Sequence, residues 1–223
     1  MQRKIITTAD GSKTIYLPAW NEHYHSKHGA MQEALHVYIK MGFTPVINRH
    51  KSRRINILEM GFGTGLNAFL TAMAAHQVAV QTEYTGIEAF PLEAQELNVL
   101  NYARTAEEKD LFQQLHQTPW EKRYQISPYF TLKKCKKRFQ EVDEINAYDL
   151  VYFDAFGARV QPELWTEKMF SMLYKALRKN GVLVTYAAKG TARRAMETAG
   201  FTVEKLPGPP GKREMLRATK KPA

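Results

Sequence analysis

The sequence predicts an α/β protein built around one doubly wound, mostly parallel sheet, and three observations carry this prediction. Apolar, β-rich runs alternate with helical patterns from Ile55 to Phe201. The first of these runs is followed by Gly61, Gly63 and Gly65, which is typical of a tight turn from a strand into a helix. Two β-rich runs end the chain with a linker too short for a crossover helix, so the last strand should be antiparallel.

Length and composition predict one domain with a small extension. The chain has 223 residues, of which 44% are hydrophobic, enough for one α/β core. We expect a hairpin and helix extension over residues 1–54, packed on a sheet domain over residues 55–223. Cys135 is the only cysteine, which fits a reducing compartment. The sequence shows no signal-peptide core and no membrane-spanning run, so we expect a cytoplasmic protein.

The charge balance favours a polyanionic partner. The formal net charge is +10 and the sequence pI is about 9.6. A surplus of this size favours nucleic acid through counterion release, although a protein can also be merely basic. The densest basic run, residues 133–138, fits either a solvated loop or a set of phosphate contacts.

The N-terminal residues predict a hairpin followed by a helix. Two β-rich runs flank Asp10-Gly11, a pair favoured in type I′ turns. The polar, aromatic loop after the hairpin holds three histidines whose spacing does not match a zinc-ligand pattern, so we expect no metal. A helix should run from about Ala30 to about Met41, with an apolar face of Met31, Leu35, Tyr38 and Ile39. Residues 50–54 form a basic lead-in to the first central strand.

The remaining elements follow from periodicity and from helix-end signals. Strands are expected over residues 83–89, 129–134, 148–156, 182–187, 201–206 and 214–219. An amphipathic helix is expected over residues 66–76, and a second should begin with Pro91 at its first position and run to about Tyr102. A third should run over residues 162–178, ended by Asn180-Gly181, and a fourth should carry Arg193 and Arg194.

Three acidic residues should meet at one edge of this sheet. Glu59, Glu88 and Asp154 each stand at the carboxyl end of a predicted strand, where open α/β sheets bind their ligands. Glu88 follows the glycine turn at roughly the 20 residues expected for a carboxylate that binds ribose hydroxyls. The alternatives are an ordinary surface glutamate for Glu88 and a structural or cofactor-contacting aspartate for Asp154.

The glycine spacing distinguishes among nucleotide ligands. The turn reads G-x-G-x-G, without the Gly-Lys-Ser/Thr of a phosphate loop and without the G-x-G-x-x-G of a dinucleotide turn. Glu59 beside it would repel a pyrophosphate and would suit the ammonium and sulfonium groups of S-adenosylmethionine. A plain strand-to-helix turn and a nicotinamide-dependent oxidoreductase are the alternatives.

Four stretches resemble the methyltransferase domain of the MnmC family, which completes 5-methylaminomethyl-2-thiouridine at the tRNA wobble position. They are residues 58–67, 88–92, 153–156 with 162–165, and 208–216. Three features depart from the family. We expect no flavin-dependent oxidase activity, which a second domain supplies in its best-known members. The usual Asp-Gly-Phe-Ala-Pro is replaced by Asp-Ala-Phe-Gly-Ala from Asp154 on, and the residues around Cys135 are more basic.

The resemblance implies the class I, Rossmann-like methyltransferase fold and methyl transfer to the exocyclic amine of 5-aminomethyl-2-thiouridine. Asp154 would orient that amine and accept its proton. The residues expected to bind S-adenosylmethionine are Glu59, Gly61, Phe62, Gly63, Gly65, Asn67, Glu88, Ala89 and Phe90. Those expected to contact RNA are Lys189, Lys212 and Arg213.

The expected partners are the anticodon region of tRNA and a separate flavin-dependent oxidase acting upstream. Two other functions remain open on the sequence alone. The first is a methyltransferase for a small-molecule or protein amine, which shares the cofactor site without needing the basic charge. The second is a non-catalytic RNA-binding module of the same fold.

Overall fold

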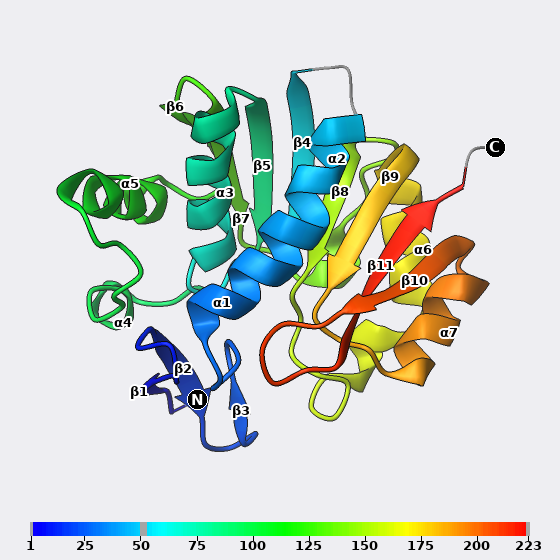
Figure 1. Ribbon diagram of the computed structural model, residues 1–223, viewed down its shortest axis with the longest axis horizontal. Helices are drawn as coiled ribbons and strands as arrows, with labels where there is room; N and C mark the ends of the chain where they lie inside the picture. Colours follow the sequence, from blue (N-terminus) through cyan, green and yellow to red (C-terminus); the bar gives the residue numbers. More distant parts are fainter. Residues whose placement is uncertain (1, 50–52, 222–223) are drawn as a thin grey trace.

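The computed structural model describes residues 2–49 and 53–221. Within these residues, eight strands form a central sheet in the order β10-β11-β9-β8-β4-β5-β7-β6 (Figure 1). The five inner strands from β9 to β7 are parallel, whereas β11 and β6 are antiparallel to their neighbours. The strand bounds are β4 Arg54–Met60, β5 Gln81–Ile87, β6 Arg123–Ser127, β7 Phe130–Cys135, β8 Tyr148–Phe153, β9 Leu177–Thr185, β10 Phe201–Pro207 and β11 Glu214–Lys220.

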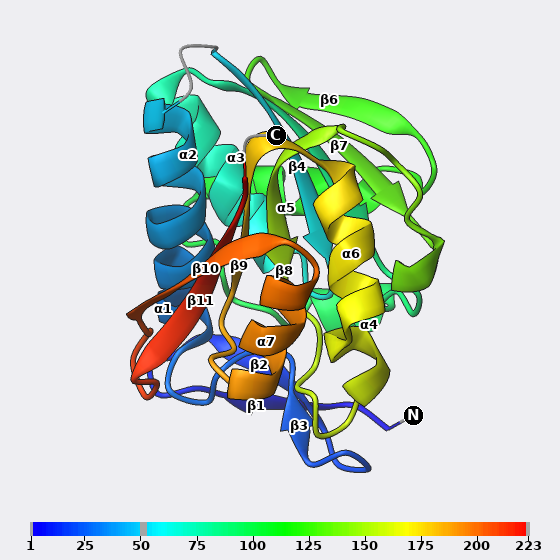
Figure 2. The same ribbon diagram turned by 90° about the vertical axis from the view of Figure 1, so that its right-hand side faces the viewer.

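The predicted doubly wound sheet with an antiparallel last strand is therefore confirmed, while the edge strand β6 was not predicted. Helices cover both faces of this sheet (Figure 2). One face carries α1 Ala30–Ala34, the π-helical η1 Leu35–Phe43, α2 Thr44–Arg49 and α3 Leu66–Val78. The other carries α6 Glu167–Ala176 and α7 Gly190–Thr198. The remaining helical segments are α4 Ala94–Leu97, α5 Ala106–Gln117, η2 Phe139–Glu141 and η3 Pro162–Trp165.

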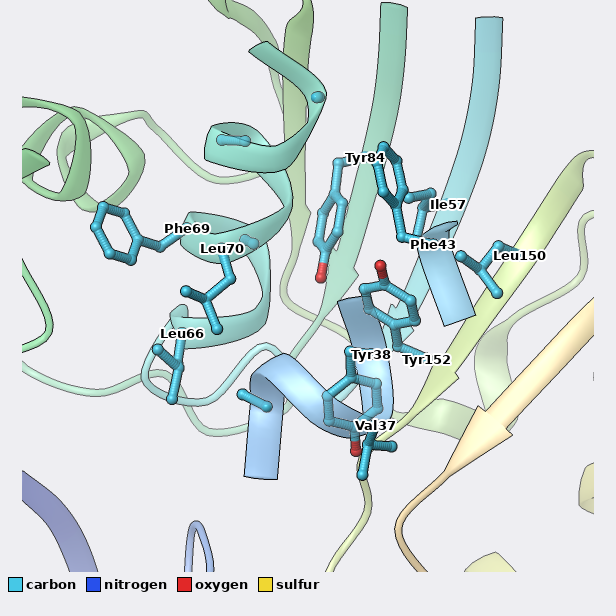
Figure 3. Packing of buried hydrophobic residues seen from close by; sticks show 14 of the residues in the cluster. Val37, Tyr38, Phe43, Ile57, Leu66, Phe69, Leu70, Tyr84, Leu150 and Tyr152 are labelled. Carbon is cyan, nitrogen blue, oxygen red and sulfur yellow. The ribbon is translucent and has the colours of Figure 1, made fainter. Parts of the chain in front are cut away.

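Alternate residues of the central strands supply the two halves of the core. On β8, Leu150 and Tyr152 join the cluster under η1 and α3, whereas Val151 and Phe153 join the cluster under α6. This alternation is expected for strands buried on both faces. Figure 3 shows the first cluster, in which side chains of η1 and α3 meet those of β4, β5 and β8.

The order in which strands are added to the sheet reverses at β4. From β4 the chain adds β5 and β7 on one side, and it later adds β8 and β9 on the other. The carboxyl ends of β4 and β8 are therefore neighbours, and the backbone N–H of Asp154 donates to the Met60 carbonyl at 3.0 Å. Ligands of open α/β sheets bind at such a switch point.

The N-terminal hairpin forms a separate three-stranded sheet of β1 Lys4–Thr7, β2 Lys13–Leu17 and β3 Glu22–His23. Its turn is not the predicted type I′, because Gly11 has a positive φ of 82° and Asp10 does not. Asp10 instead accepts the backbone N–H of Ser12 at 3.0 Å, and the Gly11 N–H donates to the Thr8 carbonyl at 3.0 Å. The carboxylate closes the turn, so only one left-handed residue is needed.

The helix predicted to end near Met41 continues through η1 and α2 to Arg49. Of the predicted apolar face, Tyr38 is buried, and Met31 and Ile39 pack against the core. Leu35 does not belong to that face, since it is 44% exposed, whereas Val37 is fully buried. A π-helical stretch has more residues per turn, which rotates the side chains relative to an α-helical periodicity. Gly42 brings this stretch close to the sheet, because a Cβ there would lie 2.9 Å from Val184 Cγ2.

Three further helix predictions need correction. The first seven residues of α3 are buried all round, so it is not amphipathic as expected. Pro91 does not begin a helix; α4 begins at Ala94 and has one turn. The predicted helix over residues 162–178 is divided into η3 and α6 and ends at Ala176, and Asn180-Gly181 lies within β9. Near this pair the register between β8 and β9 shifts.

The basic run at residues 133–138 begins within β7 rather than in a loop. Lys134 is 2% exposed, and its Nζ donates to the His116 carbonyl at 2.9 Å. The same Nζ lies 5.1 Å from the ring centroid of Trp120, a cation–π contact. Lys134 is therefore a packing residue.

The predicted division at residue 54 stays a prediction, and most of the basic lead-in, residues 50–52, lies outside the described residues. Among the described residues, we find no helix with the length and apolar character needed to span a membrane.

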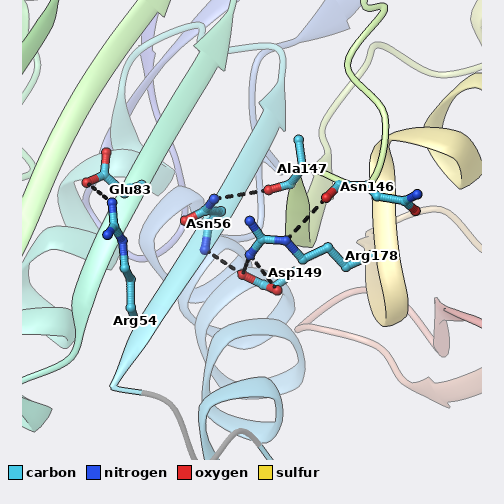
Figure 4. Close-up of polar contacts among 7 residues, drawn as sticks. All are labelled: Arg54, Asn56, Glu83, Asn146, Ala147, Asp149 and Arg178. Atoms are coloured by element: carbon cyan, nitrogen blue, oxygen red, sulfur yellow. Dashed lines mark hydrogen bonds and ion pairs between the residues drawn. The ribbon is translucent and has the colours of Figure 1, made fainter.

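An ion pair between the buried Asp149 and the half-exposed Arg178 links β4, β8 and β9 (Figure 4). Both Asp149 carboxylate oxygens accept from Arg178 Nη1, at 3.0 and 2.8 Å, and Oδ2 also accepts from the Asn56 backbone N–H at 2.8 Å. We expect Arg178→Leu to lower the free energy of unfolding by about 1–3 kcal/mol, because it leaves the Asp149 carboxylate underpaired. Urea titration measures this change.

The matched control is Arg193→Leu, which removes an exposed ion pair with Glu197 on α7. Exposed pairs of this spacing are worth about 0.5 kcal/mol or less. Equal losses in the two variants would contradict the importance assigned to the Asp149 contact.

Candidate active site

The glycine turn after β4 needs glycine because of its backbone conformation, as the sequence suggested, and because another strand end lies close to it. Gly61, Gly63 and Gly65 have φ values of 102°, 51° and 72°, all in the left-handed range. A Cβ on Gly61 would lie 2.7 Å from the backbone oxygen of Asp154. The turn is therefore pressed against the end of β8, and any side chain at Gly61 would push the two strand ends apart.

The amide of Asn67 joins two carboxyl groups behind this turn. Its Nδ2 donates to Glu59 Oε1 and to Asp154 Oδ2, both at 2.9 Å. Glu59 is fully buried, and burial raises the pKa of its carboxyl group well above the usual range. Two buried acceptors, Glu59 Oε2 and Asn67 Oδ1, have no hydrogen-bond partner.

Asp154 itself is half-buried and reaches the wall of the cavity. Burial raises the pKa of its carboxyl group to about 7, against the opposing effects of the Tyr38 hydroxyl and the Asn67 amide. A carboxyl group with such a pKa changes between its acid and its base form near neutral pH, which suits it to proton transfer.

Glu88 follows β5 and is bound to the glycine turn. Its Oε2 accepts the backbone N–H of Gly63 at 3.0 Å, and its Oε1 accepts that of Phe90 at 2.9 Å. Each oxygen therefore keeps a free lone pair for a ligand.

The loop after the N-terminal hairpin forms the opposite wall, through a buried histidine. His25 Nδ1 lies 3.0 Å from Thr14 Oγ1, and its Nε2 lies 3.3 Å from Thr64 Oγ1 in the glycine turn. Burial lowers the pKa of His25 to about 4, so the ring is neutral near pH 7. His25 thus attaches the hairpin to the glycine turn, while His23 and His28 line the cavity.

These groups surround one cavity of about 1130 Å³. The sequence-predicted residues that line it are Gly61, Phe62, Gly63, Asn67, Glu88, Ala89, Phe90, Asp154, Lys189 and Lys212. Three predicted residues do not line the cavity. Glu59 lies behind Asn67, and Gly65 faces His116, whose Cε1 would be 2.8 Å from an added Cβ. Arg213 is exposed outside the cavity.

Sequence reasoning missed an aromatic wall and several polar residues. Phe156 makes edge contacts with Trp20 and Tyr24, at ring-centroid distances of 5.6 and 5.1 Å. The gathering of aromatic residues in a polar loop after the hairpin was the available signal for Trp20 and Tyr24. Glu33 and Tyr186 also line the cavity and had no local signal.

Metal binding has no candidate group, since no three His, Cys, Asp or Glu side chains of the described part of the chain are placed to share an ion.

Comparisons with known proteins agree with this geometry. A family model described as S-adenosyl-L-methionine-dependent methyltransferase matches residues 103–221. The tRNA 5-methylaminomethyl-2-thiouridine biosynthesis bifunctional protein MnmC of Azoarcus sp. (strain BH72) is 30% identical over 221 residues, covering 92% of this chain and 34% of that protein. The protein of the same name from Burkholderia thailandensis is 30% identical over 217 residues, covering 91% and 33%. The chain spans about a third of the length of these relatives.

Solved structures support the same resemblance. The crystal structure of MnmC2 from Aquifex aeolicus matches with a TM-score of 0.82 and 26% identity, covering 100% of this chain and 72% of that one. A probable spermidine synthase from Corynebacterium glutamicum matches with a TM-score of 0.55 and 16% identity, covering 99% and 77%, which shows the fold alone. The resemblance to the MnmC family and the Rossmann-like fold class are confirmed.

The buried His25 makes stability depend on pH. An unfolded histidine takes up a proton near its ordinary pKa of 6.5, whereas folded His25 stays neutral down to about pH 4. The unfolded state therefore binds more protons in this range. The stability that the neutral His25 contributes is lost as pH falls from about 6.5 to about 4. We expect His25→Gln to reduce this acid loss by about 3 kcal/mol, measured by urea titration at several pH values.

The control is His76→Gln, at the exposed end of α3, which should leave the acid loss unchanged. His116, whose pKa burial also lowers to about 4, remains in both variants and supplies the residual slope. An unaltered slope in His25→Gln would show that His25 is not held neutral.

Proposed function

Because the chain belongs to the family of S-adenosyl-L-methionine-dependent methyltransferases, we propose that it methylates the exocyclic amine of 5-aminomethyl-2-thiouridine at the tRNA wobble position. The choice of acceptor is supported by the MnmC relatives, whose name states biosynthesis of 5-methylaminomethyl-2-thiouridine in tRNA. The observation that carries the proposal is Asp154, a carboxyl group with a pKa of about 7 on the wall of the cavity beside the glycine turn.

The cavity fits S-adenosylmethionine on three counts. Its volume exceeds the ~300–1,000 Å³ of ordinary small-molecule sites, so a cofactor and an acceptor base can share it. Gly61 and Gly63 line the cavity without side chains, and Glu88 keeps free lone pairs for ribose hydroxyls. We place the methionine portion along Gly61 and Gly63, with Phe62, Ala89 and Phe90 beside the nucleoside.

In this proposal, Glu59 and Gly65 do not contact the cofactor and act through neighbouring residues. Glu59 fixes Asn67, and Gly65 begins α3 at the turn. Bound S-adenosylmethionine would supply a methyl group activated by its sulfonium. Asp154 orients the acceptor amine and accepts its proton, so the carboxylate must be ionised for transfer to occur. Phe156, Trp20 and Tyr24 offer ring faces and edges to a base that has left the anticodon stack.

The basic surface serves tRNA in this proposal. The net charge of +10 favours binding through phosphate contacts, and Lys189 stands at the cavity wall with Arg213 exposed outside it. Lys212 is not carried forward as an RNA contact, because the structure pairs its ammonium with Glu33. A separate flavin-dependent oxidase would act upstream, and both reactions would take place in the cytoplasm.

Glycine at position 61 should be needed for cofactor binding. We expect Gly61→Ala to weaken S-adenosylmethionine binding by about tenfold or more, because its Cβ would displace the Asp154 carbonyl. Isothermal titration calorimetry measures this. The control is Gly11→Ala, which has a similar φ of 82° and open space around its Cβ. Gly11→Ala should lower the stability of the protein and leave its affinity for S-adenosylmethionine unchanged. Equal affinities of the two variants would show that Gly61 is not needed for cofactor binding.

Asp154 should be needed for methyl transfer. With labelled S-adenosylmethionine and bulk tRNA lacking the finished wobble modification, wild-type incorporation should rise with pH through about 7, as the carboxyl group ionises. We expect Asp154→Asn to lower the rate by about 10²–10⁴-fold and to remove this pH dependence, with S-adenosylmethionine binding retained.

If the Asp154→Asn variant still labels tRNA at the wild-type rate, the proposed reaction is correct and Asp154 has no part in catalysis. Absence of label with normal S-adenosylmethionine binding by the wild type would overturn the tRNA assignment, in favour of a small-molecule or protein amine.

A further inference from the structure

The loop between β10 and β11 places the half-buried Lys212 on the wall of the cavity. The Lys212 ammonium forms an ion pair with the Glu33 carboxylate of α1, which is 7% exposed. The same Nζ lies 3.9 Å from the ring centroid of Tyr186, just after β9. Both Lys212 and Tyr186 line the cavity that holds Asp154.

Each partner of Lys212 is itself fixed. Tyr186 donates its hydroxyl to the Ala155 carbonyl at 2.8 Å, next to Asp154 in the chain. Glu33 accepts the Ser26 backbone N–H at 2.9 Å. A Cβ on Gly211 would lie 2.3 Å from His28 Cδ2, so the loop is tightly packed against the N-terminal segment. Lys212 thus stands between this segment and the backbone beside Asp154.

Charged and titratable groups face Asp154 from every element packed around it. Glu33 of α1 raises the pKa of Asp154, whereas hydrogen bonding by Tyr38 of η1 and Asn67 of α3 lowers it. Asp154 in turn raises the pKa values of Glu59 on β4 and of Tyr186. Lys212 is the cation of this group, and its charge lowers the pKa of Asp154.

We propose that Lys212 is a positioning residue for methyl transfer, which favours the ionised form of the Asp154 carboxyl group and, through Tyr186, holds the adjoining backbone in place. Glu33 holds Lys212 in this position and partly offsets its charge. This inference rests on the proposed function for the identity of the acceptor. It assigns Lys212 to the proton-accepting side of the site, in place of the phosphate contact that its sequence context suggested.

The role predicts opposite effects for the two members of the ion pair. Lys212→Met removes the cation that favours the Asp154 carboxylate, so the acid limb of the pH–rate profile should move to higher pH. The rate near pH 7 should fall about fivefold. Glu33→Gln removes a like charge and leaves Lys212 unpaired, so the limb should move to lower pH. Lys212→Arg keeps the positive charge, so its acid limb should stay close to the wild-type position.

A readout without substrate tests the same coupling. Thermal unfolding is followed from about pH 5 to about pH 9 for Lys212→Met, Asp154→Asn and the double variant. The loss of melting temperature caused by Lys212→Met should grow as pH rises through about 7, because the ion–ion attraction exists only when Asp154 is ionised. In the Asp154→Asn background the same substitution should cause a loss that does not change with pH.

Two results would overturn the inference. A melting-temperature loss that is independent of pH in both backgrounds, with an unmoved acid limb, would make Lys212 a purely structural clamp. A weakened tRNA affinity with a reduced salt slope, and no shift of the acid limb, would make it a phosphate contact.

Failure of the proposed function looks different. If wild type transfers no methyl group to tRNA while the unfolding data show the pH-dependent coupling to Asp154, the acceptor is wrong and the role of Lys212 stands.

Discussion

The contact on which the site depends is the bridge that Asn67 makes between Glu59 and Asp154. One amide group at the beginning of α3 holds the ends of β4 and β8 together, at the point where the sheet changes direction. The bridge requires α3 to begin immediately above the strand ends, which the left-handed glycines after β4 allow. It also places a carboxyl group on the cavity wall in surroundings dense enough to keep its pKa near 7.

Two loops outside the central sheet complete the cavity, one near each end of the chain. The loop after the N-terminal hairpin reaches the glycine turn through His25 and supplies Trp20 and Tyr24. The β10–β11 loop closes the other side through Lys212 and its contact with α1. In the proposed function, the central sheet therefore positions the turn that would bind the cofactor, and the added segments would define the acceptor side. Relatives of this fold can differ in acceptor while sharing the sheet, because these segments lie outside it.

Charge is divided between the surface and the site. The chain carries a net charge of +10, yet Glu33, Glu59, Glu88 and Asp154 gather around or behind the cavity. A basic exterior attracts a polyanion over long range, and carboxyl groups inside can hold an amine and a sulfonium. Burial raises the pKa values of Glu59 and Asp154, and the charge of Asp154 raises the pKa of Glu59 further.

The sequence alone determined the sheet except for its edge strand β6, and it determined the edge at which the acidic residues meet, because alternation, glycine spacing and strand ends are local signals. The rule that parallel strands end at one edge brought Glu88 and Asp154 to the cavity and Glu59 directly behind it. Only the tertiary structure decided that Val37 rather than Leu35 is buried in the helix from Ala30, where a π-helical stretch rotates the side chains. It also decided that Lys212 meets Glu33, 179 residues away. Such pairings depend on burial and on how distant segments pack, and periodicity in the sequence carries no record of either.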